Sequence, residues 1–251
     1  GPVSVAQMMD WSCGLDGPHR TAVEHGDGPL VIAAGAGTGK TRVLTARVAR
    51  LLDAGVPPER ILLLTFTRRA AASMTTRAAA LCSEPRAAQR IAGGTFHAVA
   101  HRVVSEYAQH LGLRDVTVLD PDDVTDLLDL LRAEHGLDGT ERRLPTTRAM
   151  ADICSRAVNT ATPARTVIAE QFPWALPCAD QVAELLRHYA GRKRERGLLD
   201  LDDLLVAWRA LVRDEVVGSR QRARWDWVLV DEYQDVNQLQ VDIVRGLAPE
   251  G

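Results

Sequence analysis

The stretch from 34 to 41 reads Ala34-Gly35-Ala36-Gly37-Thr38-Gly39-Lys40-Thr41, and it decides the fold class. An apolar run, Leu30–Ala33, precedes it, and a helix-like stretch, Arg42–Ala49, follows it. A strand, a glycine-rich turn, Lys-Thr and a helix in this order predict the phosphate-binding loop of a nucleoside triphosphatase. Glycines let successive backbone N–H groups turn towards phosphate oxygens, and the helix N-terminus adds partial positive charge. The sequence therefore predicts a triphosphate site in an α/β protein.

Each residue type in this loop has a role in holding Mg-ATP. The backbone groups expected to surround the phosphates belong to Gly35, Ala36, Gly37, Thr38 and Gly39. Lys40 can reach the β- and γ-phosphates, and the Thr41 hydroxyl can ligate Mg²⁺. Lys40 is one of two lysines among 30 basic residues, which indicates a need for a compact ammonium there. Ala34 departs from the strict pattern, which has Gly, and a plain glycine turn between strand and helix is the alternative.

The composition is that of an ordinary soluble globular protein. Hydrophobic residues make up 46% of the 251 residues and charged residues 25%, with a net charge of −3. This balance argues against a basic body wrapped by nucleic acid, although local basic patches remain open. No apolar run approaches the about 20 residues of a membrane span, so we expect no membrane contact and a cytoplasmic location. The four cysteines lie far apart, as expected for free thiols in a reducing compartment.

Two kinds of sequence alternate along the chain. Residues 30–95 alternate short apolar runs with helical stretches, which is typical of a parallel sheet covered by helices. Helical periodicity dominates residues 95–224, and Trp227–Val230 then restores a strand. We therefore predict an α/β parallel sheet interrupted by an all-helical insertion. Its boundaries are predicted as 1–94 with 225–251 for the discontinuous sheet domain and 95–224 for the inserted subdomain.

Several elements can be placed by their residues. Strands are expected at Ile61–Phe66 and Ile91–Phe96, and a helix at about Arg69–Leu81. Asp120 followed by Pro marks a helix start. The apolar spacing in Val182–Tyr189 predicts a buried helix face.

An acidic pair after the last predicted strand supplies the second half of the site. Asp231 would hold Mg²⁺, through water, and Glu232 would orient and deprotonate the attacking water. Taken alone, such a pair is more often a solvated turn. The phosphate loop upstream favours the ATPase interpretation.

The segment Asp231-Glu232-Tyr233-Gln234-Asp235-Val236-Asn237 closely resembles the second ATPase motif of the UvrD/PcrA/Rep group of superfamily 1 helicases. Four other segments match motifs of this group in the same order: Ala34–Leu44, Thr65–Ala71, Gly94–Ala98 and Leu199–Leu205. The resemblance extends from about Leu15 onward and implies a RecA-like first motor domain with an inserted helical subdomain. It also implies ATP-driven movement along single-stranded DNA in the 3′→5′ direction.

The resemblance assigns further roles around the nucleotide. The catalytic residues it implies are Lys40, Glu232, Asp231 and Gln234, with Gln234 sensing the γ-phosphate. Arg42 matches an arginine that packs against the adenine; the alternative is a surface arginine in the first helical turn. His19 stands near the place where the group has a glutamine that reads the adenine. Since imidazole lacks the donor–acceptor pair of an amide, adenine selectivity is open.

The DNA contacts of the group fall on Thr65, Phe66, Thr67, Thr95 and His97. An aromatic ring at a strand end can stack on a base, and hydroxyls can bind phosphate without reading sequence. Phe66 alone would more often be a core residue, and His97 a core or capping histidine. Arg68-Arg69 replaces the usual Asn-Lys, which should keep phosphate affinity. The basic run Arg192–Arg196 could bind duplex backbone or be a solvated helix face.

The expected partners are single-stranded DNA or its junction with duplex, a second motor domain and DNA-repair proteins. The match stops at Gly251, before the motifs of the second RecA-like domain, so we expect this chain alone to hydrolyse ATP slowly and not to unwind DNA. The alternatives are a non-catalytic module that binds nucleotide or single-stranded DNA, the motor part of a helicase–nuclease, and an unrelated phosphate-loop enzyme such as a small-molecule kinase. No acceptor site for a kinase is visible.

Overall fold

The computed structural model describes residues 30–31, 40–137, 144–231 and 236–247. The chain divides into two compact units. The first unit consists of Gly1–Val99, Arg209–Val236 and Gln240–Gly251, and the second of Ala100–Trp208 and Asn237–Leu239. The helices α5 (Phe96–Glu106), α10 (Leu201–Arg213) and α12 (Gln238–Leu247) have residues in both units.

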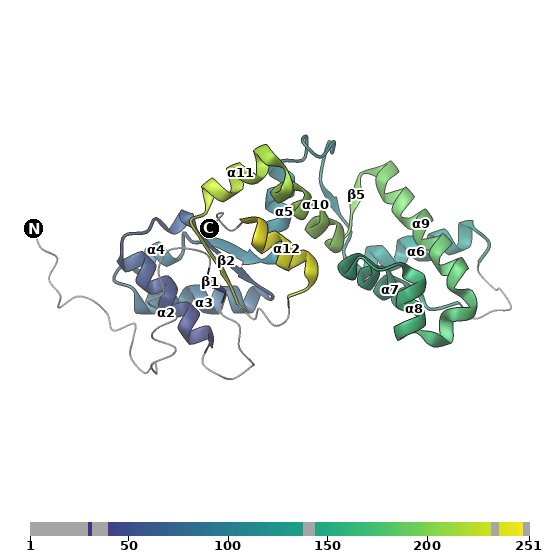
Figure 1. The fold of residues 1–251 in the computed structure, drawn as a ribbon, viewed down its shortest axis with the longest axis horizontal. Helices are drawn as coiled ribbons and strands as arrows, with labels where there is room; N and C mark the ends of the chain where they lie inside the picture. The colour runs from purple at the N-terminus through teal and green to yellow at the C-terminus, as the bar shows by residue number, and fades with distance from the viewer. Residues whose placement is uncertain (1–29, 32–39, 138–143, 232–235, 248–251) are drawn as a thin grey trace, which may run out of the picture. The chain divides into compact units, whose positions relative to one another are not determined.

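A four-stranded parallel sheet forms the centre of the first unit (Figure 1). Its strands, in spatial order, are β1 (Leu30–Val31), β6 (Trp227–Val230), β2 (Ile61–Thr65) and β3 (Ala92–Thr95). The strand restored late in the sequence, β6, therefore lies between the two earliest ones. The predicted α/β class with a parallel sheet is confirmed.

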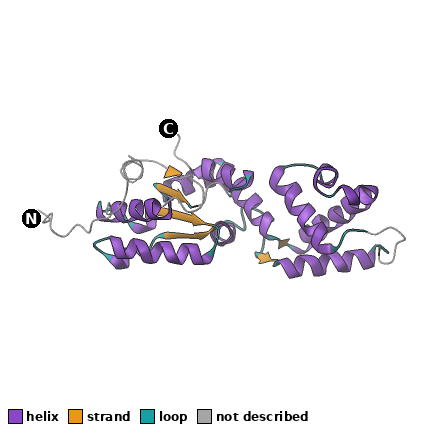
Figure 2. Ribbon diagram, turned by 90° about the horizontal axis from the view of Figure 1, so that it is seen from below, coloured by secondary structure: helices purple, strands orange, loops and turns teal. Residues whose placement is uncertain are grey.

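Helices cover both faces of this sheet (Figure 2). All five residues of β2 are buried, which explains why the strand is a continuous apolar run and does not alternate. Its residues Ile61 and Leu63 pack in one core cluster with α2 (Lys40–Asp53) and α3 (Arg68–Leu81). The remaining elements of the first unit are η2 (Pro58–Arg60), α4 (Pro85–Ala88) and α11 (Glu215–Arg224).

The predicted boundary of the insertion at residue 224 differs from the grouping of contacts. Residues 209–224 group with the first unit. Arg209 and Arg213 form ion pairs with Asp242 at 3.4 and 3.2 Å, which hold the end of α10 against α12. The division into a sheet domain of residues 1–94 with 225–251 and an inserted subdomain of residues 95–224 stays a prediction.

The second unit is a set of packed helices. They are α6 (Pro121–Glu134), α7 (Thr147–Thr160), α8 (Ala164–Gln171), η3 (Pro173–Cys178) and α9 (Ala179–Arg196). A parallel pair of short strands, β4 (Thr117–Val118) and β5 (Leu198–Leu199), is also present, and the sequence pattern did not predict it. Pairs this short carry no periodicity that could be recognised in the sequence.

The apolar core of this unit follows the predicted helix faces. Val182, Leu185, Leu186 and Tyr189 of α9 are all buried in it. Helix α6 begins as predicted, because Asp120 and Asp123 form a reciprocal capping box.

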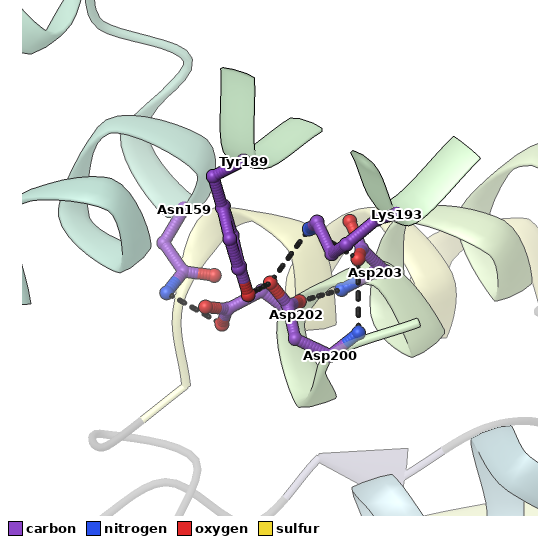
Figure 3. A network of polar contacts seen from close by, with 6 residues as sticks. All are labelled: Asn159, Tyr189, Lys193, Asp200, Asp202 and Asp203. Atoms are coloured by element: carbon purple, nitrogen blue, oxygen red, sulfur yellow. Dashed lines mark hydrogen bonds and ion pairs between the residues drawn. The ribbon is translucent and has the colours of Figure 1, made fainter. Parts of the chain in front are cut away.

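A buried polar cluster joins α9 to α10, and we call it the Lys193 cluster (Figure 3). Lys193 is 7% exposed, and its Nζ lies 2.8 Å from Asp200 Oδ2 and 2.5 Å from Asp203 Oδ2. Tyr189 donates its hydroxyl to Asp200 Oδ2 at 2.8 Å. Burial lowers the pKa of Lys193, but the two carboxylates raise it by more, so the pKa lies above its ordinary value. The lysine is therefore charged, and its carboxylates are satisfied.

The cysteines that the structure describes, Cys82, Cys154 and Cys178, are free thiols, as predicted. Burial raises the pKa of Cys154 to about 12, which leaves it an unreactive thiol at neutral pH. None of the described helices is long and apolar enough to cross a membrane.

Gly93 offers a test of the sheet. It pairs with Leu63, and a Cβ added at Gly93 would lie 2.3 Å from the Leu63 carbonyl oxygen, closer than two such atoms can approach. Gly93→Ala should lower the free energy of unfolding by about 1–3 kcal/mol, measured by denaturant titration, because β2 and β3 must separate. In Gly191→Ala, where α9 leaves open space, stability should be unchanged or raised by up to about 1 kcal/mol. Equal stability of the two variants would contradict the close pairing.

Lys193 offers a test of the second unit. Lys193→Met removes the ammonium between the buried carboxylate of Asp200 and the half-buried carboxylate of Asp203, and should destabilise the unit by about 3–5 kcal/mol at neutral pH. Without the lysine the carboxylate pair binds a proton more readily, so the loss should be smaller at about pH 4 than at about pH 8. Arg194→Met, at the exposed neighbouring position, should change stability by less than about 0.5 kcal/mol. A loss for Lys193→Met that does not depend on pH would argue for packing alone.

Candidate nucleotide and nucleic-acid site

The described site residues at the strand ends, Thr65, Thr95 and Asp231, lie at one edge of the sheet in the first unit. In a parallel sheet all carboxyl ends lie on the same side, and ligands of open α/β sheets bind there. Val31 pairs with Val230, Leu64 pairs with Val230, and Thr65 pairs with Thr95. The chain thus leaves β1, β6, β2 and β3 at the same edge.

The phosphate loop lies largely outside the described residues. Gly35, Ala36, Gly37, Thr38 and Gly39 belong to that part, as does His19. Helix α2 begins at Lys40, directly after the loop, as the motif predicts. Thr45 Oγ1 donates to the Thr41 carbonyl oxygen within the first turns of this helix. The position of a helix N-terminus after β1 suits binding of a phosphate group.

Asp231 lies at the carboxyl end of β6, beside the end of β1. Asp231 is buried, with 6% of its surface exposed. Its backbone N–H donates to the Leu64 carbonyl oxygen at 3.0 Å. This bond extends the β6–β2 ladder by one residue and fixes the backbone at Asp231. A carboxylate and a hydroxyl are oxygen ligands of the kind that Mg²⁺ prefers, so Asp231 and Thr41 fit the predicted metal role. Glu232 and Gln234 lie outside the described residues.

Arg42 lines a cavity on the surface of the first unit. It is exposed in the first turn of α2, and the cavity has a volume of about 310 Å³. The other lining residues are Thr45, Arg77, Ala80 and Leu81. Arg77 has no sequence signal of its own, because an exposed arginine in a helix is common.

The end of β2 carries the first group of predicted DNA contacts. Thr65 is fully buried, and its hydroxyl donates to the Thr67 carbonyl oxygen at 3.1 Å. Thr67 is exposed and caps α3, because its Oγ1 accepts from the Ala70 N–H at 3.1 Å. Thr65 therefore shapes the turn, whereas Thr67 and the half-buried Phe66 reach the surface.

The end of β3 repeats this arrangement. Thr95 Oγ1 accepts from the Ala98 N–H at 3.1 Å and caps α5. Phe96 is buried, and its ring centroid lies 5.6 Å from that of Phe66 in a tilted pair. His97 is half-buried in the first turn of α5. Phe66 therefore contacts the buried Phe96, which is a core contact of the kind expected for the alternative interpretation of Phe66.

Two helix N-termini thus meet the same edge of the sheet. Both α3 and α5 begin there with a threonine cap, and Arg68 and Arg69 are exposed at the start of α3. Backbone N–H groups, hydroxyls and guanidinium groups are the contacts that proteins use for nucleic-acid phosphates. The arrangement can bind a phosphate backbone without reading its sequence.

Two cations of the basic run Arg192–Arg196 have partners within the fold, and the alternatives of duplex binding and a solvated face remain for the others. Arg192 forms an ion pair with Glu134 at 2.5 Å, and Lys193 is buried in the Lys193 cluster. The exposed cations of the run are Arg194 and Arg196. Half of the run's positive charge is therefore used within the fold.

Comparison with known proteins gives the same picture. A protein-family model described as the UvrD/REP helicase N-terminal domain matches residues 15–251. The chain is 36% identical over 251 residues to the ATP-dependent DNA helicase UvrD1 of Mycobacterium tuberculosis. The aligned region covers 98% of this chain and 32% of that protein. It is 36% identical over 240 residues to the ATP-dependent DNA helicase PcrA of Leuconostoc citreum, covering 94% of this chain and 31% of that protein.

The chain thus spans about a third of the length of these relatives. The family match runs through both units and includes both the phosphate-loop segment and the acidic segment. The chain belongs to the UvrD/REP helicase family and matches its N-terminal domain.

Proposed function

We propose that this chain is the ATP-binding motor half of a UvrD-like 3′→5′ DNA translocase, which couples Mg-ATP hydrolysis to movement on single-stranded DNA. One observation carries the proposal. The parallel register brings the end of β1, which precedes the phosphate-loop segment in the sequence, to the same edge of a single sheet as Asp231 and the capped N-termini of α3 and α5. An ATP site and a nucleic-acid site on one rigid element can influence each other through small shifts of that element.

The nucleotide half of this edge would work as follows. Lys40 would contact the β- and γ-phosphates, while Thr41 and Asp231 would hold Mg²⁺. Magnesium would neutralise phosphate charge as it develops in the reaction. Glu232 would orient the attacking water and accept its proton, and Gln234 would respond to the γ-phosphate. Arg42 would pack against the base, with the cavity beside it as the space for that base.

The nucleic-acid half would use Thr67, Thr95 and His97 for phosphate and sugar contacts, and the half-buried Phe66 would contact a base. Thr65 would act by holding the turn, since its hydroxyl is bonded to Thr67. Arg68 and Arg69 would add cationic contacts that do not depend on sequence. The proposed partners are single-stranded DNA or its junction with duplex, a second motor domain and DNA-repair proteins.

A non-catalytic module that binds nucleotide and single-stranded DNA is the second candidate. The buried Asp231 argues against it, because a scaffold has no use for a carboxylate held at the end of β6. A single-turnover measurement distinguishes the two candidates. The motor half should hydrolyse bound ATP, whereas a non-catalytic module should not.

Lys40 tests the nucleotide assignment. Lys40→Ala removes charge-assisted hydrogen bonds to the phosphates, each worth about 1.5–3 kcal/mol, so affinity for Mg-ATP should fall by at least about tenfold. The measurement is titration with a fluorescent ATP analogue. Arg50→Ala, in the last turn of the same helix, is the control and should bind as the wild type does. Unchanged affinity in a folded Lys40→Ala variant would overturn the phosphate-loop assignment.

Salt dependence tests the DNA assignment. Binding of single-stranded DNA should tolerate changes of sequence and weaken steeply with salt, with a log–log slope of about −2 if about three phosphates are neutralised. Arg69→Ala should make this slope shallower by about 0.7. Arg86→Ala, exposed on α4, should leave it unchanged. Affinity that does not vary with salt would exclude phosphate contacts at this edge.

A further inference from the structure

Beyond the Lys193 cluster, side-chain hydrogen bonds connect Asp202 of α10 through Asn159 to Asn237, which directly precedes α12; Figure 3 shows the bond between Asn159 and Asp202. Asn159, on α7, donates from Nδ2 to Asp202 Oδ1 at 3.2 Å. Asn237 donates from Nδ2 to Asn159 Oδ1 at 3.3 Å. Asn159 therefore uses both ends of its amide to join two segments that lie far apart in the sequence.

The end of this series of hydrogen bonds at Asp202 lies in a turn that several bonds hold in place. Asp200 and Asp203 bond each other's backbone N–H groups at 2.8 and 2.9 Å, which forms a reciprocal cap on α10. Both carboxylates also bind Lys193. Asp202 lies between them in the sequence, so the Lys193 cluster fixes the turn from which Asp202 reaches Asn159.

The polarity of the chain follows from the chemistry of its members. The Asp202 carboxylate can only accept, so Asn159 must turn its NH₂ group towards it. This leaves the Asn159 carbonyl oxygen for position 237, where only a donor can pair with it. The Asn237 amide supplies that donor. A carboxylate at one end thus requires a donor at the other.

The other end of this series of hydrogen bonds is Asn237, at the end of the acidic motif. Asp231 is fixed to the sheet of the first unit through its bond to Leu64, whereas Asn237–Leu239 group with the second unit. The grouping of contacts thus changes from the first unit to the second between Val236 and Asn237, at the end of the acidic motif.

We propose that Asn159 is a positioning residue for the ATPase motif: it anchors Asn237, the last residue of the acidic segment Asp231–Asn237. The anchoring itself stands on the contacts of Asn159. Its consequence for hydrolysis rests on the proposed function. Residues 202 and 237 would then be coupled through Asn159.

Exchanging the donor and the acceptor at the two ends of the hydrogen-bonded chain tests the coupling between positions 202 and 237. Asn237→Asp places acceptors at both ends of Asn159 and should break the anchor. Asp202→Asn alone should be tolerated, because its amide oxygen still accepts from Asn159. In the double variant Asn159 can flip, donate to the carboxylate at position 237 and accept from the amide at position 202. The double variant keeps the net charge of the wild type.

The first readout is hydrogen exchange of peptides that begin at Asp231 and end within α12. Asn237→Asp should speed exchange there by at least about tenfold, Asp202→Asn by less than about twofold, and the double variant should return to within about threefold of wild type. Thr160→Ala is the control and should match wild type, because Thr160 is exposed beside Asn159 and its hydroxyl donates to the Arg156 carbonyl oxygen of its own helix. Double-variant exchange as fast as that of Asn237→Asp, or no effect of Asn237→Asp, would overturn the proposal.

The second readout separates positioning from binding. Single-turnover ATP hydrolysis should fall by at least about tenfold in Asn237→Asp and recover in the double variant, with affinity for ADP within about twofold throughout. If the wild-type chain bound no nucleotide, the proposed function would fail, while the exchange pattern would still decide the role of Asn159. If hydrolysis were equal in all variants while exchange changed, the anchor would not position the motif.

Discussion

Parallel pairing of β1, β6, β2 and β3 is the constraint on which the rest of the structure depends. Because β6 lies between β1 and β2, residues separated by nearly two hundred positions, such as Val31 and Val230, become neighbours. Every strand of this sheet ends at the same edge, so each loop that follows a strand meets the others there. The long helical excursion between β3 and β6 leaves this edge intact because it begins and ends outside the sheet.

The second unit depends on a different kind of contact. Its apolar core packs four helices, while the Lys193 cluster fixes the junction of α9 with α10. A buried ammonium with two carboxylates contributes little net stability compared with apolar residues, but it tolerates few alternative arrangements. Such a cluster is suited to define the position of Asp202, and through Asn159 that of Asn237. The polar contacts of the helical unit therefore extend from Lys193 to Asn237.

Much of the fold follows from sequence patterns that have one structural solution. The buried strands Ile61–Thr65 and Trp227–Val230, and the cap at Asp120, lie where composition and spacing predict them. The threonines at the strand ends were predicted to contact DNA, and the structure shows that Thr67 and Thr95 also cap helices. Thr65 is buried, which its motif could not reveal, since burial depends on what covers the strand end. The short strands β4 and β5 depend on pairing across many residues and leave no local signal.

By itself, the sequence determined the parallel α/β class, the helical excursion and the identity of the residues at the phosphate loop and the acidic motif. These properties rest on local chemistry: apolar runs, glycine turns and caps act within a few residues. Only the tertiary structure decided that Lys193 is buried between Asp200 and Asp203, that residues 209–224 group with the sheet unit, and that Asn159 joins Asp202 to Asn237. Those contacts join side chains from different segments, and no local sequence pattern indicates which residue pairs with which. The pairs form only when the helices pack together.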